Sequence, residues 1–191
     1  NPIHNIQRCL QTALKRTAPG APGRDLLEVA VEEVERLARL TQQLLNVFRT
    51  SMVHEPGVPV SLNRIIEEVL ASAGEELHGH RVAVELVITP SLPMVLGSAD
   101  KLKQVFLNLV LNARDAMPEG GRLRIETAKA NGDVRVTVDD TGIGIPAANI
   151  HRIFDAFFTT KHKVSGVGLG LSVTYGIVRQ ARGHVRVASE P

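Results

Sequence analysis

The helix expected over residues 100–117 carries a line of polar side chains beside its apolar face. Asn108, Asn112 and Asp115 are spaced at i, i+4 and i+7, so they lie above one another along one side of an α-helix. Asparagine is a poor helix former, and two asparagines inside an apolar stretch cost stability. A single asparagine there is explained as a solvated residue. Together, amide oxygens and a carboxylate are hard ligands that suit Mg²⁺ bound with phosphate.

A glycine loop, DDTGIGIP over residues 139–146, directly follows an expected strand. Gly142 and Gly144 have no side chains to keep a flat ligand away from the backbone. A buried carboxylate at Asp140 would accept a hydrogen bond from an exocyclic amine of that ligand. The alternative interpretation is a simple turn, in which the Asp140 side chain bonds the backbone of its own loop.

A second glycine-rich segment, GVGLGL over residues 166–171, opens another expected helix. Backbone N–H groups and the helix dipole make such an N-terminus an anion site. The spacing is GxGxG, no strand directly precedes it, and no GxxxxGK[ST] loop occurs in the chain. Dinucleotide-binding and P-loop folds are therefore disfavoured.

Between the two glycine segments lie Phe154, Phe157 and Phe158, three of the five phenylalanines of a chain that has one tyrosine and no tryptophan. The segment lacks strand alternation and continues as Thr159-Thr160-Lys161. It is interpreted as an aromatic-anchored lid base between glycine hinges, with Lys161 long enough to reach a terminal phosphate as a point charge. Ordinary core packing of the phenylalanines is the alternative.

Hydrophobic periodicity predicts the elements that hold these segments. Helices are expected at 61–73, with Ser61 as N-cap, at 100–117 and at 171–181. Strands are expected at 81–88, 123–127, 134–138 and 184–188, and Asn131-Gly132 predicts a hairpin between the middle two. This order favours an α+β layer fold over a doubly wound parallel sheet.

The first 55 residues predict an antiparallel helical hairpin, broken at Pro19–Gly23. A heptad pattern follows the break, with Leu27, Val34, Thr41 and Phe48 spaced by seven. One hairpin leaves an apolar face uncovered, and pairing with a second copy as a four-helix bundle would cover it. Docking of the hairpin on the rest of the chain is the alternative. Residues 56–60 are expected to be a linker.

The composition of the chain argues against several classes of protein. The chain has 191 residues, 43% of them hydrophobic, and a formal net charge of +2. The near-balance of charge argues against a nucleic-acid surface, and no apolar run approaches the ~20 residues that span a membrane. Cys9 is the one cysteine, which excludes a disulfide framework and fits a reducing compartment.

The polar line, the two glycine segments and the phenylalanine segment resemble, in their order and spacing, four motifs of a known ATP-binding domain. These are the N, G1, F and G2 boxes of the domain shared by histidine kinases, type II topoisomerases, heat-shock-90 chaperones and MutL. The N box is Asn108–Ala116, the G1 box Asp140–Gly144, the F box Phe154–Lys161 and the G2 box Gly166–Leu171. The resemblance covers residues 61–191 and is greatest to bacterial sensor histidine kinases of the nitrogen-regulation type. It implies an α/β-sandwich with a mixed sheet after a dimerisation hairpin over residues 1–55.

The resemblance also implies roles for residues. Asn112 would hold Mg²⁺ between the phosphates, Asp140 would bind the adenine amino group, and Lys161 would hold phosphate as the lid closes. The ATP contacts would come from Asn108, Asn112, Asp115, Asp140, Gly142, Gly144, Ile145, Phe158, Thr159, Thr160, Lys161, Gly166, Val167, Gly168, Leu169, Gly170 and Leu171.

The residue type at position 108 distinguishes the histidine kinases from the ATPase members of the family. The ATPase members carry a glutamate there as the base that activates water, and an asparagine cannot take a proton. Asn108 therefore favours phosphotransfer to a histidine, for relay to a response-regulator aspartate. The alternatives are an ATPase clamp of the topoisomerase, chaperone or MutL type, and a non-enzymatic scaffold or phosphatase-biased module with a degenerate nucleotide site. Intact Asn112, Asp140 and Gly168 argue against degeneracy.

The ends of the chain depart from the family pattern. Asn1-Pro2 matches the end of the family's His-Glu-x-x-Asn-Pro motif, so the phosphoacceptor histidine is expected before residue 1 and the chain is not expected to autophosphorylate. Asn1 would stand at the family's phosphatase position, and His4 is a weak substitute acceptor. The family's last strand is expected to be missing after Ser189-Glu190-Pro191. A homodimer, a receiver-domain partner and a cytoplasmic location, within a larger sensor, are implied.

Overall fold

The computed structural model describes residues 2–52, 57–130, 132–160 and 168–190, and within the first range it describes side chains for residues 5–38. The chain divides into two compact units. The first contains the N-terminal helices, and the second comprises Val53–Thr159 together with Gly168–Pro191. Among the described residues, no helix is both long and apolar enough to span a membrane.

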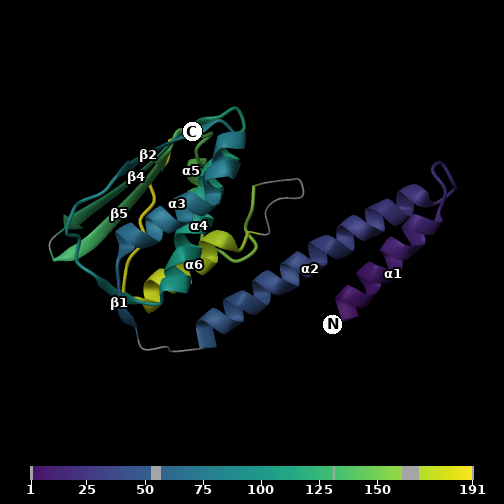
Figure 1. Cartoon of the computed structure of the whole chain (residues 1–191), viewed down its shortest axis with the longest axis horizontal. Helices are drawn as coiled ribbons and strands as arrows, with labels where there is room; N and C mark the ends of the chain where they lie inside the picture. Colours follow the sequence, from purple (N-terminus) through teal and green to yellow (C-terminus); the bar gives the residue numbers. More distant parts are fainter. Residues whose placement is uncertain (1, 53–56, 131, 161–167, 191) are drawn as a thin grey trace. The chain divides into compact units, whose positions relative to one another are not determined.

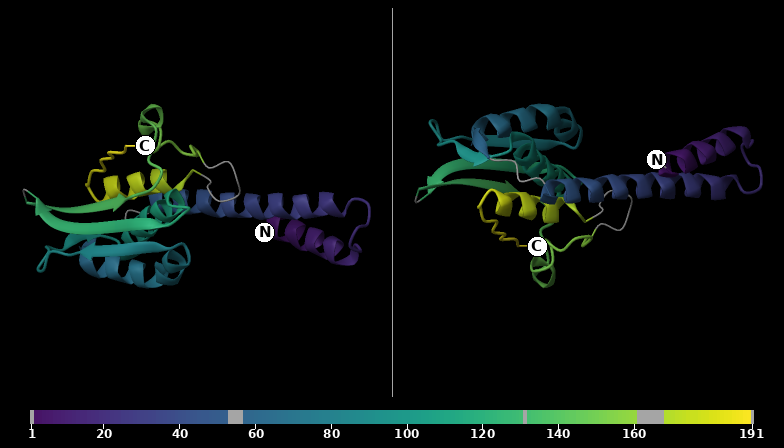
Figure 2. Two further views of the ribbon diagram at one scale, coloured as in Figure 1. Left: turned by 90° about the horizontal axis from the view of Figure 1, so that it is seen from above. Right: turned by 90° about the horizontal axis from the view of Figure 1, so that it is seen from below.

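The first unit is the predicted hairpin. Helices α1 (Pro2–Arg16) and α2 (Arg24–Met52) lie side by side and run in opposite directions (Figure 2). Gly20 and Gly23 in the connector have φ of 79° and 83°, which suits glycine. The Arg24 guanidinium donates to the carbonyl oxygens of Leu14 and Thr17, at 3.3 and 2.5 Å, and so ties the start of α2 to the end of α1.

The second unit contains the remaining elements (Figure 1). In chain order they are β1 (Val58–Val60), α3 (Leu62–Gly79), β2 (Val82–Val87), β3 (Val95–Gly97), α4 (Ala99–Ala116), β4 (Gly121–Ala130), β5 (Asp133–Asp140), α5 (Ala147–Ile150) and α6 (Gly170–Gln180). The predicted helices at 61–73, 100–117 and 171–181 correspond to α3, α4 and α6. Ser61 caps α3 as predicted by accepting the Arg64 N–H, but α3 continues to Gly79, because Leu77 on its last turn is still buried in the core.

The sheets confirm the predicted mixed α+β architecture. Strands β2, β4 and β5 form one sheet, in which β2 and β4 are parallel and β4 and β5 antiparallel. The β4–β5 hairpin closes at the pair Ala130–Asp133, and Gly132 between them has φ of 89°, in agreement with the predicted hairpin; Asn131 lies outside the described residues. Strand β1 pairs with β3, so Val58–Val60 belong to the folded unit and not to the expected linker.

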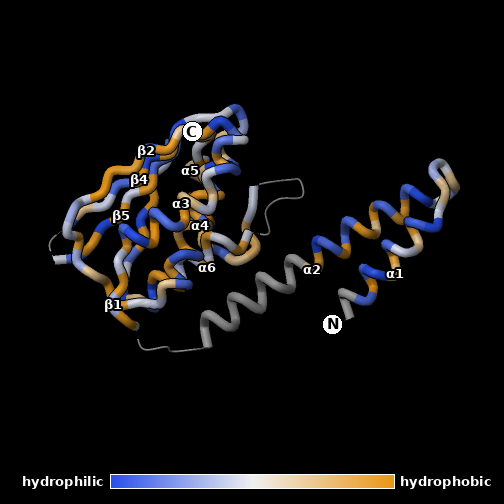
Figure 3. The backbone as a smooth tube through the Cα atoms, viewed as in Figure 1, coloured by the Kyte–Doolittle hydropathy of each residue, from blue (hydrophilic) through white to orange (hydrophobic). Residues whose placement is uncertain are grey.

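The three longer helices α3, α4 and α6 lie on one face of the sheet (Figure 1). Strand alternation explains this layering, because Leu123 and Ile125 of β4 are buried beneath the helices whereas Arg122 is exposed. Figure 3 shows the resulting alternation of apolar and polar residues along the strands. The core includes Ile66 and Leu77 of α3 and Phe106 and Val110 of α4.

The predicted strand at 184–188 is wrong: these residues have no regular secondary structure and belong to neither sheet. The alternation of Val185 and Val187 with charged residues indicates which faces the side chains take, but a strand also needs backbone partners. The Ser189 hydroxyl, just after this segment, accepts the N–H of Ile145 at 2.8 Å and so connects the segment to the first glycine loop.

Thr127 on β4 joins three segments of the domain. Its side chain is 1% exposed, and its hydroxyl accepts the Thr89 N–H and donates to Asn63 Oδ1, both at 3.0 Å. Thr127→Val keeps the shape but leaves both partners unpaired, so we expect the free energy of unfolding to fall by about 1–3 kcal/mol in chemical denaturation. Thr137→Val, on the exposed face of β5, is the control, and an equal loss in both variants would contradict the expectation.

Candidate functional site

Helix α4 is the element around which the predicted site residues gather. Its side chains Val105, Phe106, Val110 and Ala113 are buried in the core, which fixes how the helix is rotated. Asn108, Asn112 and Asp115 are half-buried along a neighbouring side, as their spacing predicts. Seven residues of helix rise about 10 Å, so this polar line has two ends, and different segments lie against each.

The start of α6 lies against the Asn108 end of the polar line. The Asn108 amide Nδ2 donates to the carbonyl oxygen of Gly170 at 3.1 Å. A Cβ added to Gly170 would lie 3.7 Å from Asn108 Cγ and 3.8 Å from Asn112 Nδ2. The amide groups of two predicted residues therefore meet the glycine-rich N-terminus of α6.

Gly168 packs against the backbone of the phenylalanine segment. Its φ is +70°, and an added Cβ would be 2.4 Å from the Phe158 carbonyl oxygen and 2.5 Å from the Phe157 carbonyl carbon. The carbonyl oxygen of Gly168 accepts the Phe157 N–H at 2.9 Å. The second glycine segment and the phenylalanine segment are thus in backbone contact, and glycine at 168 makes this contact possible.

The first glycine loop lies against the other end of α4. The Ile143 N–H donates to the Ala116 carbonyl at 2.9 Å, and a Cβ at Gly142 would be 2.6 Å from both that oxygen and Ala116 Cβ. Gly144 has φ of 68°. Glycine at 142 is therefore required by the close approach of the loop to the helix, and glycine at 144 by its backbone conformation.

Asp140 is exposed, so the expectation of a buried carboxylate is wrong. Its Oδ1 accepts the Gly142 N–H at 2.9 Å, which is the turn proposed as the alternative. In register Asp140 is opposite Leu123, whose side chain faces the helices, whereas Asp139 is opposite Arg124 on the outer face. The carboxylate is thus on the helix side of the strand end and open to a ligand.

Asp115 is held by an ion pair that the sequence did not predict. The Arg114 Nε donates to Asp115 Oδ1 at 2.8 Å, and the same guanidinium pairs with Glu76 of α3. Both Arg114 and Asp115 are largely buried, with side-chain exposures of 13% and 19%. No group of three or more His, Cys, Asp or Glu in the described ranges could hold a metal ion.

Aromatic contacts anchor the phenylalanine segment in part. Phe154 packs on Tyr175 of α6 with ring centroids 5.2 Å apart, and the Arg152 guanidinium lies 4.5 Å from the centre of the Phe158 ring. Phe157 is 55% exposed and has φ of 69°. The sequence missed Arg152 and Tyr175, because their partners depend on the path of the chain through the turns before α6.

The structure leaves part of the predicted site undescribed. Asn1, Lys161, Gly166 and Val167 lie outside the described residues, and no side chain is described for His4. The remaining predicted residues differ in burial: Leu169 is buried, Ile145, Phe158 and Leu171 are half-buried, and Thr159 and Thr160 are exposed.

The groove between α3 and α4 is a separate feature. It measures about 430 Å³ and contains none of the predicted site residues. Lys103 and Glu68 pair across it at 2.7 Å, and hydrogen bonds from Lys103 and Arg64 lower the pKa of Glu68. This groove lies on a side of α4 different from the polar line.

Asn108→Asp tests the contact between α4 and α6. The change removes the donor and places a carboxylate beside the Gly170 carbonyl, so we expect the free energy of unfolding to fall by about 1–3 kcal/mol in chemical denaturation. Asn112→Asp introduces the same charge one turn away, where no bond to that carbonyl is present, and we expect a smaller loss. Equal losses would show that the charge, and not the hydrogen bond, matters.

Comparisons with known proteins identify relatives of this chain. A family model described as histidine kinase-, DNA gyrase B-, and HSP90-like ATPase matches residues 97–191. The sensor histidine kinase ZraS of Escherichia coli (strain K12) is 31% identical over 190 residues, which cover 100% of this chain and 40% of ZraS. The solved catalytic domain of the histidine kinase ThkA is 31% identical, with a TM-score of 0.60, over 66% of this chain and 82% of that domain. The chain belongs to the sensor histidine kinase family.

For this histidine kinase chain, the matched region begins at Gly97 and so includes α4, both glycine segments and α6. The structure of full-length ShkA in complex with AMPPNP, at 24% identity and a TM-score of 0.70, covers 94% of the chain and 38% of ShkA and shows the same fold. A complex of ThkA with the response regulator TrrA matches 95% of the chain and 53% of ThkA, at 25% identity and a TM-score of 0.68. The kinase chain spans less than half the length of its curated relative ZraS.

Proposed function

We propose that this chain is the ATP-binding core of a sensor histidine kinase, which binds Mg-ATP and passes the terminal phosphoryl group to a histidine for relay to a response-regulator aspartate. Family membership supports the proposal, as does the match to ShkA, whose structure was solved with the ATP analogue AMPPNP. The alternative is an ATPase clamp, in which the same fold hydrolyses ATP.

One observation carries the proposal: the Asn108 amide bonds the Gly170 carbonyl and brings the polar line of α4 to the N-terminus of α6. A helix N-terminus offers N–H groups and a positive dipole end to phosphates. Asn108 in this position is a hydrogen-bond donor and cannot act as a base for water. The site can therefore hold a triphosphate without activating water through residue 108.

The site residues fit a nucleotide with its metal. Asn112 lies beside the α6 N-terminus, and its amide oxygen is a hard ligand of the kind that suits Mg²⁺. Bound there with phosphate, Mg²⁺ would supply positive charge that offsets the phosphate oxygens. Asp140, on the helix side of its strand, would accept a hydrogen bond from the adenine amino group while Gly142 lets the base approach. Lys161 and the backbone of Gly166–Gly170 would hold the phosphates.

We further propose that the hairpin forms a homodimer and that a receiver domain docks on this kinase. On α2, Leu26 and Val29 are 72% and 58% exposed, which leaves an apolar seam to be covered.

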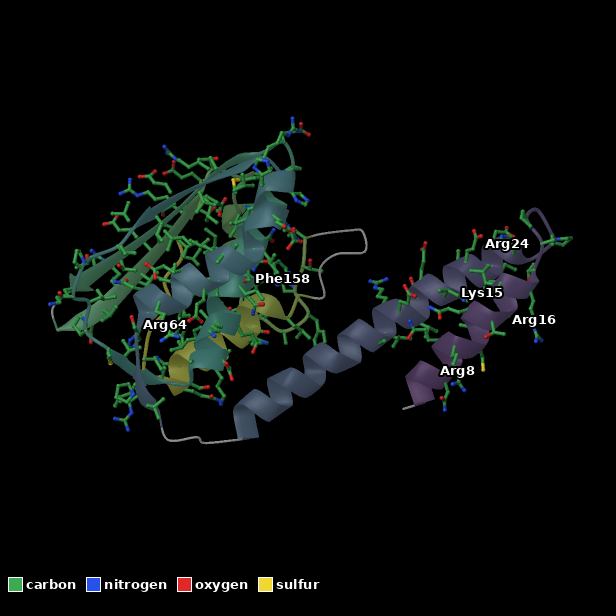
Figure 4. All side chains as sticks on the ribbon, viewed as in Figure 1. Arg8, Lys15, Arg16, Arg24, Arg64 and Phe158 are labelled. Carbon is green, nitrogen blue, oxygen red and sulfur yellow. The ribbon has the colours of Figure 1, made fainter. Side chains whose placement is uncertain are left out.

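The charges of the two helices favour the same dimer. Helix α1 has three basic and no acidic residues, whereas residues 25–35 of α2 contain five acidic ones, so packing of α1 of one copy on α2 of another is electrostatically favourable. Figure 4 shows Arg8, Lys15 and Arg16 along α1. The ThkA complex with TrrA supports a response-regulator partner.

We place the activity in the cytoplasm, within a larger sensor. The single cysteine suits a reducing compartment. In the structure Cys9 is exposed on α1.

Leu26→Glu combined with Val29→Glu tests the homodimer. A charge in the seam would have to be buried at the interface, so we expect the variant to be a monomer by light scattering under conditions in which the wild-type chain is a dimer. Thr137→Glu, which adds a charge on the exposed face of β5, outside the hairpin, is the control and should remain dimeric. A dimer that survives the double change would place the interface elsewhere.

Calorimetric titration of the chain with Mg-ATP, run beside a phosphate-release assay, tests the proposed function. We expect saturable binding and no steady hydrolysis, because no base stands at residue 108. Steady turnover of ATP would favour the clamp, and absence of nucleotide binding would contradict both enzymatic interpretations.

A further inference from the structure

Thr174 on the second turn of α6 has a buried hydroxyl without a partner. The residue is 1% exposed, and within the described part of the chain its Oγ1 is the one buried side-chain oxygen or nitrogen that makes no hydrogen bond. Leaving such a group unpaired costs about 1–3 kcal/mol. The contacts of α6 with its neighbours therefore do not explain why a hydroxyl is placed at this position.

The carbonyl oxygen to which a threonine in a helix would normally donate already accepts other hydrogen bonds. A threonine inside an α-helix commonly donates its hydroxyl to the carbonyl four residues earlier, which for Thr174 is Gly170. That carbonyl oxygen accepts Asn108 Nδ2 at 3.1 Å, and it is also the helical acceptor for the N–H of Thr174. A carbonyl oxygen has two lone pairs, and both are used.

We infer that Thr174 is a positioning residue for the nucleotide site: its hydroxyl takes over the Gly170 carbonyl when the Asn108 amide turns to the bound phosphates or their metal. The exchange keeps the Gly170 carbonyl bonded in both states, so the first turn of α6 stays in place while Asn108 moves. This inference rests on the proposed function, since it needs a ligand that attracts Asn108.

A double-mutant cycle on the nucleotide-free chain tests the exchange without any ligand. Thr174→Val removes an unpaired hydroxyl from the wild-type chain, so we expect an unchanged or slightly raised melting temperature. In the Asn108→Ala background the hydroxyl would already bond Gly170, and we expect the same change to lower the melting temperature by about 2–4 °C. A fall in the wild-type background, or equal effects in both backgrounds, would overturn the inference.

Titration with Mg-ATP provides the second measurement. We expect Thr174→Val to weaken affinity about three- to tenfold, and Thr174→Ser, which keeps the hydroxyl, to bind as the wild type. Wild-type affinity in the valine variant, or equal losses in both variants, would overturn the inference while leaving the proposed function intact. A wild-type chain that binds no nucleotide would instead overturn the proposed function, and with it the role of Thr174.

Discussion

Replacing Gly168 with alanine is expected to lower the free energy of unfolding of the ATP-binding unit by about 2–5 kcal/mol. One part of the loss is conformational, because Gly168 has φ of +70° and an alanine in the left-handed region is strained. The other part is steric, because the new Cβ would lie 2.4 Å from the Phe158 carbonyl oxygen and 2.5 Å from the Phe157 carbonyl carbon. Both are main-chain atoms, so no side-chain rotation relieves the overlap. Urea denaturation measures the loss.

Gly176→Ala is the matched control for this prediction. Gly176 lies in α6, its φ is not positive, and nothing lies within 4 Å of an added Cβ. Alanine is a better helix former, so we expect a gain of about 0.5–1 kcal/mol. If Gly168→Ala unfolded with the same midpoint as the wild type, the contact between residue 168 and the phenylalanine segment would not constrain the fold.

Asp140→Asn is expected to weaken Mg-ATP binding about 10- to 100-fold. A hydrogen bond to a charged acceptor contributes about 1.5–3 kcal/mol, and the substitution removes the charge. The asparagine carbonyl can still accept the Gly142 N–H that Asp140 Oδ1 accepts at 2.9 Å, so the loop is expected to keep its shape. The measurement is calorimetric titration, with the melting temperature of the free variant recorded to show that the fold is intact.

Asp139→Asn removes the same charge one residue away. Asp139 is opposite Arg124 in the hairpin register and lies on the outer face of the sheet, away from α4. We expect its affinity for Mg-ATP to stay within about twofold of the wild type. Equal weakening in both variants would indicate that the net charge of the strand end, and not a bond from Asp140, controls binding.

The sequence predicted the elements whose evidence is local. The hydrophobic period of α4 determines which face of the helix is buried. Asn112 and Asp115, four and seven residues after Asn108, then lie on the same side of the helix as Asn108 because of helix geometry alone. Asn131-Gly132 predicted the β4–β5 hairpin because a two-residue turn needs residues of this type. Ser61 predicted the start of α3 in the same way.

Elements that depend on distant partners were predicted less well. Val58–Val60 resemble a linker in sequence, and only pairing with Val95–Gly97, more than thirty residues later, makes them a strand. Residues 184–188 alternate like a strand but belong to neither sheet. The end of α3 was placed too early because burial of Leu77 depends on its packing in the core.

The sequence by itself determined which segments are candidates for the site: the polar line on α4, two glycine segments and a phenylalanine segment between them. Tertiary structure decided what each residue touches. It brought Asn108 to Gly170, exposed Asp140, and left the Thr174 hydroxyl without a partner. The physical reason is that helix and strand periods set the direction of side chains within one element, whereas contacts between elements depend on how their buried faces pack together.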